Sequence, residues 1–112
     1  MDEAERLLRH LALNDEESLR KVLVIGPVGP AALDEKVDRL VRLGALLALG
    51  AATTSLRTAV EHAIQAGASE PEVVDVLVSI GPAVGLARLV TAAPRLAMAL
   101  GYETEVDEEG FE

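Results

Sequence analysis

Apolar side chains recur every three to four residues along most of the chain, which is the period of one face of an α-helix. The clearest run predicts a single buried face and comprises Leu33, Val37, Leu40, Val41, Gly44, Leu47 and Ala48. No segment alternates apolar and polar residues over the length of a strand with hairpin turns around it. The pattern therefore predicts an all-α helical bundle.

The first 25 residues carry two helix-start signals. Asp2 and Glu5 form one capping-box pattern, and Asn14 and Glu17 repeat it. Residues 1–25 are therefore predicted to be an N-terminal helical arm, either two short helices meeting at Asn14 or one kinked helix. Two prolines and two glycines among residues 26–30 then predict a linker over 26–32. A phosphate-binding loop is the weaker alternative, because proline lacks the amide donor that a phosphate needs.

Residues 33–102 are predicted to form the helical core. The first core helix ends at the turn around Gly50, and Thr53 or Thr54 is expected to cap a second helix over about 55–66. Ser69 and Glu72, with a proline between them, form a capping box that opens a third helix running to residue 80.

A fourth core helix is expected over residues 83–100. The pair Gly81-Pro82 is predicted to separate it from the third helix, and Gly101 to end it. Pro94 is expected to kink this helix or to split it after Ala92. Its small residues and its apolar stripe of Leu86, Leu89, Val90 and Leu96 suggest that other subunits cover part of it.

Composition limits the chemistry. With 112 residues the chain has room for one domain, and its apolar half is enough to bury a core. The absence of cysteine excludes disulfides, zinc–thiolate sites and thiol catalysis, including peroxidase and disulfide-reductase activity. His10 and His62 are far apart and lack ligand-like neighbours, so neither a metal site nor a cofactor is predicted.

The net charge of −9 is concentrated at the C-terminus. Residues 103–112 contain no base and six acids, namely Glu103, Glu105, Asp107, Glu108, Glu109 and Glu112, so residues 1–102 carry only −3. This charge and the near-absence of aromatic residues argue against a nucleic-acid partner. The acidic tail over 103–112 is expected to be a solvated end; contact with a basic partner is the alternative.

The sequence also argues against a membrane location. The apolar stretch over 43–55 is too short to span a bilayer, and the longer one over 76–100 contains Arg88, Pro94 and Arg95. Acidic residues follow Met1 directly, so no signal peptide is expected and a cytoplasmic protein is predicted.

The candidate site residues lie mainly in the second core helix. Ser55, Thr58 and His62 follow helical spacing, so they share a face on which His62 could act as a general base. The alternative is an exposed helical histidine with no catalytic role. Arg39, Arg42 and Arg57 could hold an acidic substrate, or could equally form surface salt bridges with neighbouring acids. For Arg88 and Arg95, ion pairs at a subunit interface are the favoured interpretation.

Several segments taken in order resemble the carboxymuconolactone decarboxylase family, which includes alkyl-hydroperoxidase D-like proteins. The resemblance covers roughly residues 30–102 and is carried by Leu33-Asp34-Glu35-Lys36, Leu47-Ala48-Leu49-Gly50, Ser55-Leu56-Arg57 and the run from Ala63 to Val73. It implies an all-α fold whose protomers assemble, typically as trimers or hexamers, with pockets near the subunit contacts.

The redox branch of that family carries Cys-x-x-Cys-x-x-x-His at the start of the second core helix. Aligned on Leu56-Arg57, the cysteines fall on Ala52 and Ser55 and the histidine on Ala59; aligned on the preceding glycine, the first cysteine falls on residue 51. The glutamate of the first core helix falls on or near Arg39. The resemblance therefore implies that this chain lacks the thiol redox site.

The decarboxylase branch is similar in its Glu-Leu-Arg-x-His segment, of which residues 55–59 keep Leu-Arg and lose the histidine. His62 lies one turn further on. Two hypotheses follow. In the first, the protein is an oligomeric binding or scaffold module with a degenerate active site. In the second, it is a cysteine-independent decarboxylase or lactone-type enzyme acting on a small carboxylated substrate, with His62 as acid–base and Arg57 and Arg39 holding the carboxylate.

Overall fold

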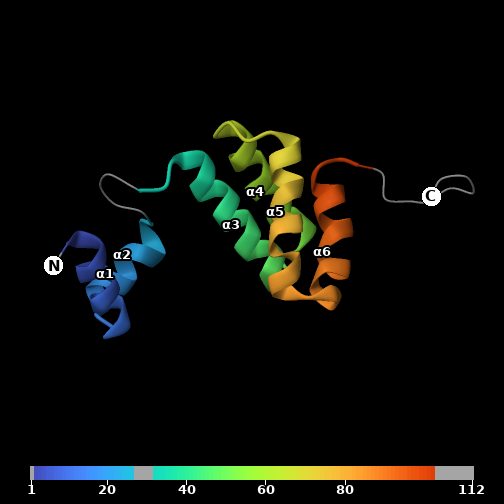
Figure 1. Cartoon of the computed structure of the whole chain (residues 1–112). Coiled ribbons are helices and arrows are strands. Elements are labelled where there is room, and N and C mark those ends of the chain that lie inside the picture. The colour runs from blue at the N-terminus through green and yellow to red at the C-terminus, as the bar shows by residue number, and fades with distance from the viewer. Residues whose placement is uncertain (1, 27–31, 103–112) are drawn as a thin grey trace, which may run out of the picture. The chain divides into compact units, whose positions relative to one another are not determined.

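A computed structural model describes residues 2–26 and 32–102, which contain six α-helices and no strand (Figure 1). The chain divides between Ala32 and Leu33 into an N-terminal unit and a core unit. The helices run in the order α1 (Glu3–Ala12), α2 (Glu16–Val24), α3 (Glu35–Leu49), α4 (Thr53–Gln65), α5 (Glu70–Val84) and α6 (Leu86–Ala99). The all-α prediction is confirmed, and none of these helices is both long and apolar enough to cross a bilayer.

The N-terminal unit is a pair of helices with almost no core of its own. Two helices rather than one kinked helix are present, and α1 begins at the predicted cap, where Asp2 accepts from the Glu5 amide at 2.7 Å. The cap of α2 is Asp15 rather than Asn14. Asn14 has φ +60° and forms the turn, a conformation that asparagine tolerates better than most residues. Among the described residues of this unit, the only buried one is Ser18, whose hydroxyl donates to Asp15 at 2.7 Å.

The core unit packs α3 and α6 against both α4 and α5 around an aliphatic centre. The buried hydrophobic residues are Leu43, Leu47, Leu56, Val60, Ala63, Ala68, Val73, Leu77, Ala92 and Leu96. Burial of each large aliphatic side chain contributes roughly 1.5–3 kcal/mol to folding. Leu96 is only 2 % exposed within its own protomer, so it is not available to the intersubunit stripe expected for α6.

The buried face of α3 differs from the predicted one. Leu43, Gly44 and Leu47 are buried, whereas Val41 is 56 % exposed and Leu33 is 50 % exposed. The apolar positions of α3 cover more than one face, and periodicity alone does not say which face meets the other helices.

Three helix boundaries also differ from those predicted. The N-cap of α4 is Ala52, which makes no side-chain hydrogen bond, and neither threonine serves as the cap. The break before α6 is at Gly85, whose φ +86° and ψ 172° suit only glycine, so α5 continues through Pro82. Likewise α6 is continuous through Pro94 and is not split after Ala92. A proline removes one backbone hydrogen-bond donor from its helix. A helix that packs against neighbours on both sides can tolerate the loss of that one bond.

Candidate functional site

A cleft of about 250 Å³ lies between α3 and α4. It is lined by Arg39, Arg42, Leu46, Ser55, Thr58, Ala59 and His62, and we refer to it as the α3/α4 cleft. Helical spacing explains the set: each helix contributes residues three, four and seven apart, which share one face. Two antiparallel helices thus place two guanidinium groups opposite a histidine and two hydroxyl groups.

The two arginines of the cleft differ in their surroundings. Arg42 Nε lies 3.0 Å from Asp38 Oδ2, an ion pair between neighbouring turns of α3. Arg39 is partly buried, and within the described part of the chain it has neither an acidic partner nor a side-chain hydrogen bond. A guanidinium has five donors and stays charged at every physiological pH. Arg39 therefore provides an available binding group for an anion.

The α4 side of the cleft is polar at its rim. Thr58 Oγ1 donates to the Thr54 carbonyl oxygen at 3.3 Å, while Ser55 and His62 are exposed to solvent. Among the described residues no hydrogen bond joins His62 to either hydroxyl, so the geometry holds no preformed base–hydroxyl pair. Leu46 and Ala59 supply the apolar part of the lining.

The structure brings together three of the four site residues that the sequence suggested. Arg39, Ser55 and His62 line the α3/α4 cleft, together with Arg42 and Thr58. Arg57 is exposed and does not line the cleft, so its predicted partnership with His62 has no support in this geometry and stays a prediction. Each step along a helix turns by about 100°, which points Arg57 away from the face that Ser55 and His62 share. Leu46 was missed, although it lies seven residues after Arg39 and hence on its face.

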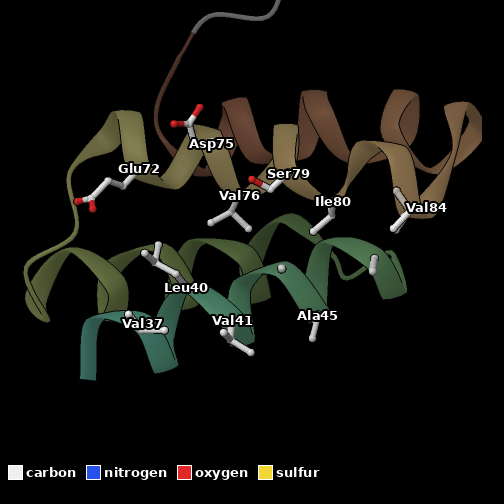
Figure 2. A pocket seen from close by; sticks show the side chains of 13 residues that line it. Val37, Leu40, Val41, Ala45, Glu72, Asp75, Val76, Ser79, Ile80 and Val84 are labelled. Carbon is white, nitrogen blue, oxygen red and sulfur yellow. The ribbon is translucent and has the colours of Figure 1, made fainter. Parts of the chain in front are cut away.

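A second and larger concavity, of about 670 Å³, lies between α3 and α5 and is mainly apolar (Figure 2). We call it the α3/α5 groove; its walls include Val37, Val41, Val76 and Ile80. Glu72 and Asp75 lie toward one end and Val84 toward the other (Figure 2). The valines of α3 were predicted to be buried, so the sequence did not indicate this groove.

One ion pair fixes the acidic end of the α3/α5 groove. Lys36 Nζ lies 2.9 Å from Glu72 Oε2, and Glu72 also accepts from the Ser69 amide at 2.9 Å. The amide of Ser69 and the ammonium of Lys36 both lower the pKa of Glu72, and Glu72 in turn raises the pKa of Lys36. In the described residues no group of three or more histidines and carboxylates is placed to hold a metal ion.

Comparison with known proteins identifies one family. Residues 18–98 match the family described as the carboxymuconolactone decarboxylase family. Neither the curated proteins nor the solved structures compared with the chain gave a match.

Proposed function

The chain belongs to the carboxymuconolactone decarboxylase family, and from this premise we propose that it is an oligomeric binding module whose α3/α4 cleft holds a small carboxylated ligand. The observation that carries the proposal is the convergence of Arg39, Arg42 and His62 on one cleft. Thiol redox activity forms no part of this function, because the chain has no cysteine.

The charges of the cleft favour a carboxylate. A planar guanidinium can donate two parallel hydrogen bonds to a carboxylate, and such charge-assisted bonds are among the stronger ones in proteins. Arg39 has no competing acid among the described residues, and Asp38 neutralises only Arg42. The hydroxyls of Ser55 and Thr58 can bond to further ligand oxygens.

The size of the cleft favours a small ligand. A volume of about 250 Å³ lies just below the roughly 300–1,000 Å³ of pockets that enclose drug-sized molecules. The short apolar section formed by Leu46 and Ala59 would accommodate a hydrocarbon segment between the polar groups. A ligand with one or two carboxylates on a compact carbon skeleton fits both features.

Isothermal titration with succinate and with benzoate tests the proposal. Arg39→Gln should weaken binding of whichever acid binds by about tenfold or more, since a charge-assisted hydrogen bond contributes about 1.5–3 kcal/mol. The matched control is Arg57→Gln, which removes the same charge from an exposed position outside the cleft. Equal losses in the two variants would show that only net charge matters, and binding of neither acid would refute the proposal.

A second candidate function is favoured by the position of His62. It faces the same cleft as Arg39, so a bound carboxylate would place the rest of the ligand within reach of an imidazole. In that case the protein is a cysteine-independent decarboxylase or lactone-type enzyme with His62 as acid–base. Turnover of a carboxylated lactone should then disappear in His62→Ala while Arg57→Gln retains it; unchanged turnover in His62→Ala would exclude this mechanism.

We also propose that the protein acts as a homo-oligomer, a trimer or a hexamer. Large apolar side chains remain exposed in the core unit, among them Val41 at 56 %, Val78 at 63 % and Leu86 at 76 %. Surfaces of this kind typically mark sites of protein association. Native mass spectrometry measures the stoichiometry directly and also detects any acid that stays bound through purification.

A further inference from the structure

Two parts of the chain carry opposite charges, namely the α3/α4 cleft and residues 103–112. The α3/α4 cleft presents Arg39, which has no acidic partner among the described residues. Residues 103–112 carry six carboxylates and no base. We propose that this acidic tail binds the α3/α4 cleft of its own chain and competes there with the small carboxylated ligand. The competition rests on the proposed function of the cleft, whereas the contact itself does not.

The tail starts at the correct end of the core. Tyr102 donates its hydroxyl to Glu70 Oε2 at 2.9 Å, so the last described residue lies beside the first turn of α5. Residues 66–69 connect that turn directly to the end of α4, and the Lys36–Glu72 pair brings the first turn of α3 to the same end. His62 and Arg39 each lie about one turn from these helix ends. The tail therefore begins at the end of the core that carries Arg39 and His62.

The tail is also long enough. A ten-residue segment can extend over at most about 33–36 Å, which exceeds the length of any helix in the core. As a tethered group it has an effective concentration in the millimolar range at the cleft. Weak contacts between exposed carboxylates and guanidinium groups can thus compete with a free acid at low ionic strength.

Charge selects the cleft over the larger groove as the binding site. The charged residues that line the α3/α5 groove are Glu72 and Asp75, both of the same sign as the tail. Lys36 pairs with Glu72, so Asp75 is the groove charge that would repel the tail. Arg39 of the cleft has no acidic partner among the described residues and would attract the tail. The side chains of Val106 and Phe111 add apolar groups that can contact Leu46 and Ala59 in the cleft.

A spin label on the tail tests the contact without any ligand. The chain contains no cysteine, so Gly110→Cys provides a single attachment site for a nitroxide in the full-length protein. Amide signals of Arg39, Thr58 and His62 should be broadened, and those at the opposite end of the core, around Gly85, should not. Adding Arg39→Gln or 0.5 M salt should remove the broadening, whereas adding Arg57→Gln should leave it.

The same label shows whether the contact lies within one chain. Protein that carries both the nitroxide and ¹⁵N is diluted tenfold with protein that carries neither. Broadening that arises within one chain is unchanged by this dilution. Broadening that disappears on dilution, that is insensitive to Arg39→Gln, or that is absent altogether would overturn the proposal.

Ligand binding then separates the two proposals. Neutralising three tail acids, with Asp107→Asn, Glu108→Gln and Glu109→Gln, should tighten succinate binding by about two- to tenfold at low salt. The control neutralises Glu3, Glu16 and Glu17 of the N-terminal unit to glutamine and should have no such effect. Broadening at the cleft in a protein that binds neither succinate nor benzoate would refute the proposed function and leave the tail contact standing. Intact succinate binding without broadening would refute the tail contact alone.

Discussion

At the scale of single residues, Arg95 makes the main polar contact between α6 and the turn that follows α3. Its Nη1 donates to the carbonyl oxygens of Gly50 and Ala51, at 2.8 Å and 3.3 Å. Gly50 and Ala51 follow the last residue of α3, so their carbonyl oxygens lie in the turn and not in the helix, and the guanidinium supplies them with charged donors. The sequence analysis expected an ion pair of Arg95 at a subunit interface; within the protomer Arg95 Nη1 binds two backbone carbonyls, and the intersubunit ion pair stays a prediction.

This contact predicts a stability difference between two arginines of the core unit. Arg95→Met should lower the free energy of unfolding by about 1–3 kcal/mol, because it leaves partly buried carbonyls without their donor. Arg57→Met is the control, since Arg57 is exposed and makes no described hydrogen bond or ion pair; it should change stability by less than about 0.5 kcal/mol. Urea denaturation measures both, and equal effects would contradict the role given to Arg95.

The same comparison shows why some residues could be predicted and others could not. Ser55, Thr58 and His62 lie on one helix, so their spacing alone places them on one face, and the cleft confirms it. The contact of Arg95 with Gly50 spans 45 residues and depends on how α6 packs, which no local pattern encodes. Arg57 was named because it follows the family motif, and helical geometry excludes it from the cleft.

At the scale of elements, the start of α5 is the most strongly specified boundary. Ser69 accepts from the Glu72 amide at 3.2 Å and Glu72 accepts from the Ser69 amide, so both bonds of the predicted capping box are present. Lys36 of α3 adds an ion pair to the same carboxylate. One side chain therefore both begins α5 and connects it to α3.

This arrangement predicts a pH dependence of stability. The pKa of Glu72 is lowered below 4.5, so its contribution is fully present above the pKa of the unfolded chain and is lost as the pH falls through the folded value. In Glu72→Gln, the midpoint of thermal unfolding should therefore fall less steeply with decreasing pH below about pH 5. Glu61→Gln, at an exposed position with no described partner, should leave the decline unchanged. A decline in Glu72→Gln as steep as in the parent protein would contradict the assignment.

Other boundaries were less predictable because two signals compete for them. Asn14 and Asp15 are both good caps, and the structure uses the aspartate while the asparagine adopts the left-handed turn. Gly81-Pro82 is typical of a helix break, yet α5 passes through it and ends at Gly85. Packing of α5 against α3 and α6 outweighs the local cost of proline there.

At the scale of the whole molecule, α3 supplies residues to three different surroundings. Leu43 and Leu47 enter the core, Arg39 and Arg42 line the α3/α4 cleft, and Val41 faces the α3/α5 groove. A helix with apolar residues around so much of its circumference is predicted to have several packing partners. The pattern does not say which partner each face meets. The surface left uncovered in the core unit is the basis for expecting self-association.

The last prediction places a second copy of the chain on the α3/α5 groove. Val41→Lys puts a charge on the groove wall, and burying it against a neighbour without a partner is unfavourable, so the association constant should fall at least about tenfold. Leu49→Lys adds the same charge to the same helix at a position that is 78 % exposed and outside the groove, and should leave association intact. Sedimentation velocity over a concentration series distinguishes the two. A parent protein that stays monomeric throughout, or equal weakening by both lysines, would exclude the groove as the subunit contact.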